Sequence, residues 1–271
     1  LDAAHLNADA RVVCAHGARR WLLRQEASRV RRFEAAEYRR FRRVVVVSRE
    51  DGAALTALDS SLRPVVIPNG VDPVAFAPAV GAGAVRDRDR VIFAGVMATA
   101  PNVSAADFLA RAVMPRVRAE IPGAHLVIVG REPARAVSRL SRLPGIEVVG
   151  EVDDIRAWLT SSSVCASPML SGTGIKNKLL EAMASGLPCV VTPRALRGMA
   201  AVPGRDVLVG RDAEQLAEHV AFLLSEPAAA RSIGAAGRAC VVSQHTWRGV
   251  ADAYLRVYEG LLFEARNGGG R

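Results

Sequence analysis

The only two lysines of this chain stand in one short loop, and their type and spacing suggest chemistry. Of the 36 lysine and arginine residues, only Lys176 and Lys178 are lysine, and both follow Gly172 and Gly174. Glycines let the backbone approach a ligand closely, and the N–H groups of the following helix attract anions. The loop therefore predicts a phosphate-binding site. The alternative is a chance pair of lysines on a solvated helix turn.

Within this loop, Lys178 is the better candidate for a phosphate contact. Residues two apart on a helix point to different faces, so at most one of the lysines reaches the same phosphate. Lys178 precedes Glu181 by three residues and shares its face. The carboxylate of Glu181 could accept two hydrogen bonds from a ribose diol. An intrahelical pair between Lys178 and Glu181 is the competing interpretation.

No established phosphate fingerprint fits the loop. The third glycine of the dinucleotide motif is missing, and neither lysine is followed by Ser or Thr as a P-loop requires. The glycines at residues 81–83 follow no predicted strand. No arrangement of Ser, His and Asp or of paired carboxylates indicates a catalytic base.

The elements that must position the loop alternate between short strands and longer helices. The strands are nearly all apolar, which is typical of a parallel sheet buried on both faces. We predict strands at Val44–Val47, Val65–Ile67, Val91–Ala94, Leu126–Val129, Ile146–Val149, Val164–Ala166, Cys189–Thr192 and Val207–Val209. We predict helices at residues 49–58, 104–120, 133–142, 154–161, 175–185, 213–225, 228–242 and 246–264. This pattern predicts an α/β fold with a doubly wound parallel sheet, whose ligands bind at the carboxyl ends of the strands.

Breaker residues sharpen these limits. Asp153 is the predicted cap of the helix at 154, and Pro227 is predicted to begin another helix. Residues 78–90 are rich in Gly, Ala and Arg without periodicity, which predicts a loop or linker.

Composition narrows the class of protein. Half of the residues are apolar and 5% are aromatic, so Val, Leu, Ile and Ala must build the core. No apolar run approaches the roughly 18 residues of a membrane span. The four cysteines have no metal-ligand spacing: Cys14, Cys165, Cys189 and Cys240. We therefore expect a reduced, cytoplasmic protein without a metal site.

The net charge of +9 is uneven, because residues 1–43 hold 11 arginines against five acidic residues. Residues 19–43 predict a helix in which Trp21 and Phe33 lie among the arginines. Such a helix fits a peripheral contact with an anionic membrane. An arginine-coated helix that packs its apolar side on its own domain is the alternative. A nucleic-acid partner is not expected, since stacking aromatics are not interleaved with the arginines.

Several segments in the same order resemble the C-terminal half of the family 4 glycosyltransferases of the GT-B fold, over about residues 40–262. The stretch 180–188, LEAMASGLP, is the most specific of them. The others are VVS at 46–48, IPNGVD at 67–72, FAGVM at 93–97, LVIVGR at 126–131 and VGEVDD at 149–154. The loop from Ser167 to Lys178 is most similar to the branch linked to exosortase/PEP-CTERM exopolysaccharide loci.

This resemblance implies that a nucleotide-diphospho-sugar lies between two Rossmann-like domains and is bound mostly by the C-terminal one. It assigns Glu181 to the ribose hydroxyls, Lys178 to a basic residue often present in this branch, and Gly95 to the neighbourhood of the diphosphate. It places residues 172–174 near the diphosphate and donor sugar, and Val152 near the nucleobase. No cofactor or metal is implied beyond the nucleotide-sugar substrate.

The chain departs from the family pattern at three positions. Many members carry a second glutamate on the donor sugar where this chain has Thr173. Others carry Arg and Lys where this chain has Val96 and Asn102. We therefore expect Thr173 to lie in the donor site, and Lys176 and Lys178 to supply the missing charge.

The resemblance also implies a division of the chain. Residues 1–67 would be a remnant of the N-terminal acceptor domain, 68–243 the nucleotide-sugar-binding domain, and 244–271 a crossover helix and tail. Catalytic residues would lie mainly in the missing part of the N-terminal domain.

The expected function is a retaining, metal-independent sugar transfer to a glycan or lipid-linked acceptor. A non-catalytic nucleotide-sugar-binding or scaffold protein is the first alternative. A sugar-nucleotide epimerase is another, and it would need acid–base residues such as Asp72, Glu151 or His125.

Overall fold

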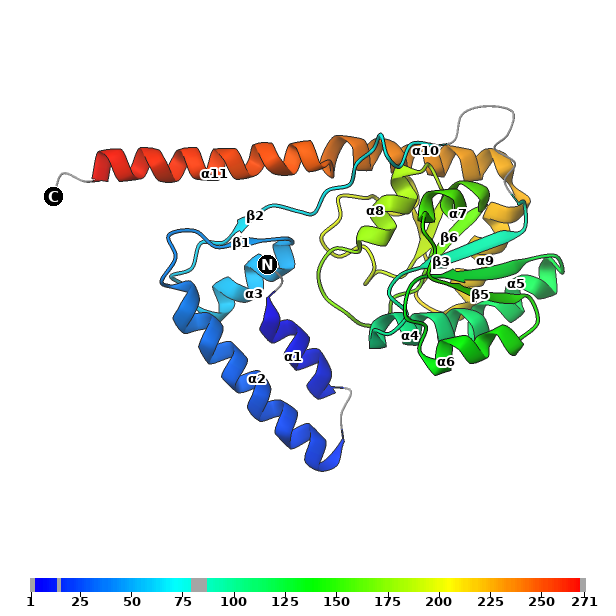
Figure 1. Cartoon of the computed structure of the whole chain (residues 1–271), viewed down its shortest axis with the longest axis horizontal. Coiled ribbons are helices and arrows are strands. Elements are labelled where there is room, and N and C mark those ends of the chain that lie inside the picture. The colour runs from blue at the N-terminus through cyan, green and yellow to red at the C-terminus, as the bar shows by residue number, and fades with distance from the viewer. Residues whose placement is uncertain (1–2, 14–15, 79–86, 269–271) are drawn as a thin grey trace.

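The larger part of the molecule is built around a six-stranded parallel sheet (Figure 1). The computed structural model describes residues 3–13, 16–78 and 87–268. The strand order is β5-β4-β3-β6-β7-β8, and every neighbouring pair is parallel. The strands are β3 (Arg90–Ala94), β4 (His125–Val129), β5 (Ile146–Gly150), β6 (Val164–Ser167), β7 (Cys189–Val191) and β8 (Leu208–Val209). The predicted α/β class is confirmed, and the strand ends lie within one residue of their predicted places.

The centre of this sheet is buried on both faces. Residues 91–94, 126–129 and 164–167 are all buried, as their apolar runs predicted. Helices lie on either side of the sheet (Figure 1). The strand order reverses between β3 and β6. Doubly wound sheets open a crevice at such a switch point, outside the carboxyl ends of the strands.

Helices connect the strands close to the predicted places. They are α4 (Ala100–Phe108), α5 (Met114–Glu120), α6 (Arg135–Ser138), α7 (Ile155–Ser161), α8 (Asn177–Ala184), α9 (Ala213–Ser225), α10 (Pro227–Gln244) and α11 (Trp247–Gly268). The helix predicted from residue 104 begins at Ala100, because Pro101 fits the first turn of a helix. The predicted start of α10 at Pro227 is confirmed.

Two helix starts were predicted wrongly for local reasons. Asp154, rather than Asp153, caps α7, since its carboxylate accepts the backbone N–H of Arg156. The helix predicted from residue 175 begins at Asn177, because Lys176 keeps an extended backbone after the loop. Cys14, residues 81–83 and most of the predicted linker lie outside the described residues.

A smaller unit precedes the sheet. It holds α1 (Ala4–Val13), α2 (Gly17–Tyr38), β1 (Val45–Val46), α3 (Arg49–Leu58) and β2 (Val65–Val66). β1 and β2 are parallel and enclose a separate small core with α3. The helix predicted over residues 19–43 ends at Tyr38, and the chain then turns so that Val44 can enter this core. Helix α1 was not predicted.

Glu34 of α2 holds the start of α1. This carboxylate is 1% exposed and lies 2.8 Å from the backbone N of Ala4 and 3.0 Å from that of His5. It also lies 2.6 Å from Nδ1 of His5 and accepts the hydroxyl of Tyr38 at 3.2 Å. A carboxylate at a helix N-terminus meets both the free N–H groups and the positive end of the helix dipole. Glu34 therefore explains why α1 forms without a strong pattern of its own.

We expect Glu34→Gln to lower the free energy of unfolding by about 3 kcal/mol, because a buried charge with several donors is replaced by a neutral amide. Urea denaturation measures this. Glu37→Gln is the matched control on the same helix, since Glu37 pairs with the exposed Arg40 at 3.0 Å. That control should lose less than about 0.5 kcal/mol. Equal losses in the two variants would contradict the role of Glu34.

The last two helices connect the larger sheet to the smaller unit. α10 and α11 run nearly in line along one side, and α11 extends beyond the six-stranded sheet (Figure 1). Near its end, Glu264 forms an ion pair with Arg43 of the smaller unit. At the junction of the two helices, Nδ1 of His245 lies 3.2 Å from the carbonyl oxygen of Asn69, and Nε2 accepts the backbone N–H of Ala200 at 3.1 Å. Burial lowers the pKa of His245, so the ring holds this junction in its neutral form. None of the helices in the described part of the chain has the length and apolar character needed to cross a membrane.

Candidate functional site

Glycines mark the carboxyl ends of two central strands. Gly95 follows β3 with φ +151°, and Gly130 follows β4 with φ +150°. A Cβ atom on Gly130 would lie 1.7 Å from the carbonyl oxygen of Gly95. The two strand ends therefore approach closely only because position 130 has no side chain. Their bare backbones leave room for a ligand at this edge of the sheet.

A cavity of about 340 Å³ opens at this edge. Its lining is Ala94, Gly95, Val96, Val129, Gly130, Arg131, Glu151, Val152, Ile155, Lys178 and Glu181. Four predicted site residues thus meet here, from three different parts of the chain: Gly95, Val152, Lys178 and Glu181. The cavity lies where a doubly wound sheet is expected to bind its ligand.

Lys178 reaches this cavity from the start of α8. Its Nζ donates to Oδ1 of Asn102 in α4 at 2.6 Å and lies 4.2 Å from the ring centroid of Phe93. Burial lowers the pKa of Lys178 to about 7; the nearby Cys165 opposes this shift and the charge of Lys176 adds to it. An ammonium held against an aromatic ring at low solvation is well suited to meet an anionic ligand.

Glu181 stands one helical turn further along α8 and is half-buried. Burial raises the pKa of its carboxyl group, which indicates a partly desolvated position. Among the described residues, no ion pair links Glu181 to Lys178, although both line the cavity. The intrahelical pair that the spacing allowed does not form. Both side chains are available to a ligand.

The glycine loop before α8 is held together by hydrogen bonds from Lys176. Gly172 and Gly174 have positive φ angles of +99° and +69°. The ammonium of Lys176 donates to the carbonyl oxygens of Thr173 at 2.5 Å and Gly174 at 2.8 Å. Lys176 therefore closes the loop on itself. These four residues do not line the cavity of about 340 Å³, and their part in donor binding stays a prediction.

Thr173 connects this loop to the smaller unit. Its hydroxyl donates to Oδ1 of Asn7 in α1 at 2.7 Å. Next to the loop, Asn177 accepts a hydrogen bond from Asn69 at 2.9 Å. The loop and the start of α8 are thus tied to the smaller unit through Asn7 and to the segment after β2 through Asn69.

The acid–base residues of the epimerase alternative do not meet in one place. Glu151 lines the cavity. His125 begins β4, at the opposite end of that strand, where it lies 3.3 Å from Asp87. The carboxylate of Asp72 accepts the backbone N–H groups of Val74 and Ala75, which lowers its pKa. The structure gives these three residues no common substrate position.

Sequence reasoning did not assign two residues of the cavity lining to the site, and it named a third residue beside the cavity only as a departure from the family pattern. Gly130 and Arg131 line the cavity, and Asn102 holds Lys178. Gly130 and Arg131 had a usable signal, because a glycine followed by a basic residue comes directly after a buried strand. The resemblance marked position 102 as a place where related enzymes carry a basic residue, but nothing in the sequence pairs Asn102 with Lys178, which is 76 residues away.

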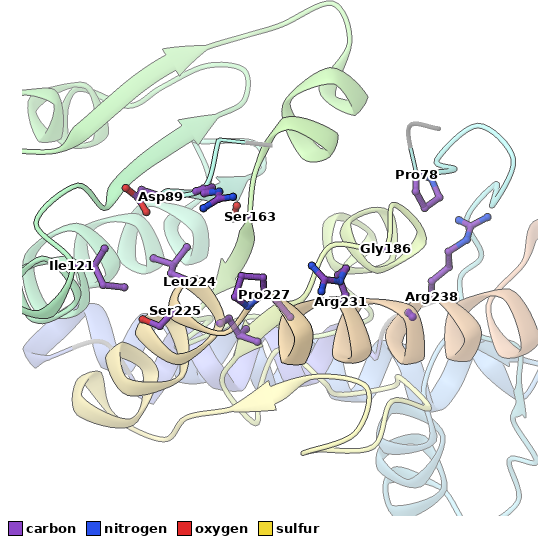
Figure 2. A pocket seen from close by; sticks show the side chains of 14 residues that line it. Pro78, Asp89, Ile121, Ser163, Gly186, Leu224, Ser225, Pro227, Arg231 and Arg238 are labelled. Atoms are coloured by element: carbon purple, nitrogen blue, oxygen red, sulfur yellow. The ribbon is translucent and has the colours of Figure 1, made fainter. Parts of the chain in front are cut away.

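A second and larger cavity, of about 820 Å³, shares no lining residue with the candidate site (Figure 2). Asp89 and Ser163 at one side of it precede β3 and β6, so it lies toward the amino ends of these strands. Figure 2 also shows Arg231 and Arg238 along α10. The guanidinium of Arg238 is used structurally, because it donates to the carbonyl oxygens of Pro73, Phe76 and Ala184. None of the predicted site residues lines this cavity.

No group of three or more His, Cys, Asp or Glu side chains that could hold a metal occurs within the described ranges. Cys165, Cys189 and Cys240 are buried free thiols. A reaction without a metal or cofactor stays a prediction.

The part of the chain that holds the cavity is similar to known proteins. A family model described as Glycosyl transferases group 1 matches residues 88–226, about half of the chain. The GDP-mannose-dependent monoacylated alpha-(1-6)-phosphatidylinositol monomannoside mannosyltransferase of Corynebacterium glutamicum is 29% identical over 204 residues, which cover 67% of this chain and 52% of that protein. The MMP alpha-(1->4)-mannosyltransferase of Mycolicibacterium hassiacum is 28% identical over 208 residues, covering 73% and 48%. This chain therefore spans about half the length of these curated relatives.

Among solved structures, sucrose-phosphate synthase from Thermosynechococcus elongatus matches with a TM-score of 0.72 and 21% identity. The match covers 87% of this chain and 62% of that one. This likeness shows a shared fold.

Proposed function

Because the chain belongs to the group 1 glycosyl transferases, we propose that it is the donor-binding half of a retaining, metal-independent enzyme. The enzyme moves a sugar from a nucleotide diphosphate to a glycan or lipid-linked acceptor. The observation that carries this proposal is the cavity beside Gly95 and Gly130, where a lysine and a glutamate meet without forming an ion pair. The GDP-mannose-dependent relative supports a nucleotide-diphospho-sugar as the donor class.

The proposed roles follow from the chemistry of each side chain. The carboxylate of Glu181 accepts the two ribose hydroxyls, and Val152 packs beside the nucleobase. Gly95 and Gly130 let the diphosphate approach the backbone. Residues 172–174 lie toward the donor sugar, and their N–H groups belong to the turn that leads into α8.

Sugar transfer leaves negative charge on the departing diphosphate. Lys178 and the N-terminal N–H groups of α8 oppose that charge in a site with little water. Because they are held in place by the fold, they need no rearrangement when the charge develops. Lys176 contributes by holding the loop closed, and it adds positive charge nearby.

Thermal unfolding with UDP, GDP, ADP and dTDP and their common sugar conjugates tests the proposal. A ligand at 100 times its dissociation constant should stabilise the chain by about 2.7 kcal/mol. A rise in the unfolding temperature with only one of these nucleotides identifies the nucleotide of the donor. No shift with any of them, in a chain with a cooperative unfolding transition, would contradict the proposal.

The second candidate function is a nucleotide-sugar-binding protein without transferase activity. The engagement of Thr173 by Asn7 favours it, because the hydroxyl that replaces a donor-sugar glutamate is already occupied. Slow hydrolysis of the donor by this chain would contradict this second candidate function. Stable binding without hydrolysis or transfer would support it.

We also propose the division of the chain at residues 67 and 243, and a place in exopolysaccharide synthesis. Two separate sheets and two separate hydrophobic cores support the first division. The end of α10 at Gln244 supports the second. The exopolysaccharide assignment rests on the resemblance of the loop from Ser167 to Lys178.

Helix α2 is the proposed site of peripheral membrane contact. It buries only Leu23, Ala27 and Glu34, while the side chains of Trp21 and Phe33 are 61% and 64% exposed. The alternative, in which the apolar residues pack on the helix's own unit, does not hold for these two aromatics. Exposed aromatics beside arginines match the interface of an anionic bilayer.

We expect the chain to bind vesicles of phosphatidylglycerol and phosphatidylcholine, and not vesicles of phosphatidylcholine alone, in a sedimentation assay. Arg20→Gln with Arg24→Gln should weaken partitioning by about 30-fold, since each basic residue contributes about 1 kcal/mol. Arg111→Gln with Arg116→Gln removes the same charge from the larger sheet's helices and serves as the control. Equal effects of the two double variants would reject α2 as the contact.

A further inference from the structure

Asn102 and Lys178 form a pair that joins α4 to α8 beside Gly95. The amide nitrogen of Asn102 donates to the carbonyl oxygen of Val96 at 2.9 Å. Its Oδ1 atom accepts a hydrogen bond from the ammonium of Lys178 at 2.6 Å. A Cβ atom on Gly95 would lie 2.8 Å from the amide nitrogen of Asn102 and 3.3 Å from Nζ of Lys178. The pair is thus held directly against the bare backbone at the carboxyl end of β3.

Among the residues that the structure describes, none forms an ion pair with the ammonium of Lys178. On its own helix stands Glu181, which forms no ion pair with it among the described residues. From β6 the Cys165 thiol faces it, and from the loop the Lys176 ammonium does. Arg131 and Glu151 also line the cavity. The partner of Lys178 is a neutral amide oxygen, which orients the nitrogen and leaves its charge uncompensated.

We propose that Asn102 and Lys178 form a proton-linked clamp for a diphosphate: binding of a nucleotide-diphospho-sugar transfers one proton from solvent to Nζ of Lys178, and Asn102 is the positioning residue that aims this nitrogen at the ligand. The inference rests on the proposed function, because it specifies how the same cavity recognises its donor. In atoms, a neutral amine, a proton and a diphosphate dianion become an ammonium–diphosphate pair. No other reactant is needed.

The direction of the effect follows from the environment of Lys178. Burial lowers its pKa to about 7 in the free chain, so above that pH the nitrogen is mostly neutral. A bound diphosphate favours the ammonium and raises that pKa. Binding therefore takes up a proton between the two pKa values, and affinity falls as the pH rises above about 7. Below pH 7 the nitrogen is already charged, and affinity changes little.

The choice of an amide at position 102 matters for this linkage. An aspartate there would keep Lys178 charged at all relevant pH values, but its own charge would repel the diphosphate. Asn102→Asp thus separates positioning from proton linkage. It preserves an oxygen acceptor for Nζ, and it should remove the proton uptake.

Isothermal titration calorimetry with the full chain tests the proposal. The probes are GDP-mannose and UDP-glucose, whose diphosphate diesters have no phosphate group that titrates near pH 7. Titrations in buffers with different ionisation enthalpies give the number of protons taken up. We expect close to one proton at about pH 8 and close to none at about pH 6, with affinity falling up to tenfold per pH unit above pH 7.

Three variants make the result specific. Lys178→Arg keeps a permanent charge, so it should bind without proton uptake and with affinity independent of pH. Asn102→Asp should bind more weakly at every pH, also without uptake. His125→Gln removes a histidine at the far end of β4 and should leave the uptake unchanged. Thermal unfolding of each variant without ligand shows that it is folded.

The possible results distinguish failure of the clamp from failure of the proposed function. Tight binding with no proton uptake and no pH dependence in the unaltered chain would overturn the clamp and leave the proposed function intact. Uptake that persists in Lys178→Arg would assign it to another group and also overturn the clamp. An unchanged proton uptake in Asn102→Asp would show that residue 102 does not contact Nζ of Lys178, which would also overturn the clamp. Failure of both sugar nucleotides to bind at any pH would overturn the proposed function together with the clamp.

Discussion

Replacing Glu181 with alanine is expected to weaken binding of the nucleotide-diphospho-sugar by at least about 100-fold. Two hydrogen bonds from a ribose diol to a carboxylate contribute about 1.5–3 kcal/mol each, and 3 kcal/mol corresponds to more than a hundredfold in affinity. Burial raises the pKa of Glu181, so the carboxylate lies in a partly desolvated place where such bonds are strong. Calorimetry at about pH 7.5 measures the loss.

A modified ligand makes this experiment specific. The unaltered chain should bind a 2′,3′-dideoxynucleotide diphosphate about as weakly as Glu181→Ala binds the ordinary nucleotide. The variant should not distinguish the two ligands. Glu147→Ala is the charge-matched control, since Glu147 is exposed on β5. If the dideoxy ligand loses affinity equally with both proteins, Glu181 is not the ribose ligand.

The unliganded Glu181→Ala protein should be at least as stable as the unaltered chain. A raised pKa means that folding disfavours the charged carboxylate, so its removal relieves a cost at neutral pH. A binding defect accompanied by a large loss of stability would therefore point to misfolding instead of a lost ligand contact.

Lys178→Met is expected to stabilise the chain at low pH while destroying donor binding. A lysine whose pKa falls from 10.5 to about 7 on folding lowers the free energy of unfolding by up to about 5 kcal/mol below pH 7. Methionine keeps the apolar contact with Phe93 but leaves Oδ1 of Asn102 without its donor, which costs about 1–3 kcal/mol. We expect a net gain of about 2–3 kcal/mol at about pH 6.

The gain in stability from Lys178→Met is expected to decrease as the pH rises. As the pH rises from about 7 toward 10.5, the unfolded chain keeps the Lys178 proton and the folded chain does not. The stability of the unaltered protein therefore rises through this window, and the advantage of Lys178→Met disappears. Urea denaturation at about pH 6 and about pH 9.5 measures both differences.

Lys176→Met is the matched control, because it removes the only other lysine. The ammonium of Lys176 donates to two loop carbonyls, so its loss should lower stability. A gain of the same size from Lys176→Met, or none from Lys178→Met at low pH, would contradict a desolvated Lys178. Together with the loss of binding, the expected result places a stability cost at the functional site, where such costs are common.

Much of the larger sheet could be predicted from the sequence. Runs such as Leu126–Val129 are apolar at every position, and only a parallel sheet covered on both faces buries such strands. Helix starts were less certain, because caps depend on single residues: Asp154 and Asp153 are equivalent in the sequence, and only the first accepts the N–H of Arg156. Helix α1 could not be predicted, since it depends on Glu34 from another helix.

The candidate site was predictable where spacing alone decides contacts. Lys178 and Glu181 are three residues apart, so a helix places them on one side whatever surrounds it. Gly95 ends an apolar strand, and its neighbour Gly130 does the same. In contrast, the predicted alternative of a Lys178–Glu181 ion pair depended on side-chain directions, and the fold instead turns the ammonium of Lys178 toward Asn102.

The α/β class, the strands, the loop that holds both lysines and the helix that carries Glu181 could all be predicted from the order of the residues. These features are local, because periodicity, glycine and chain spacing act over a few residues. Contacts between distant parts of the chain, in contrast, make Lys176 close its own loop and bring Lys178 into a cavity where it forms no ion pair with any described residue. The physical reason is that burial and hydrogen-bond partners are set by strand pairing and helix packing. These bring Asn102 and Lys178 together across 76 residues of chain.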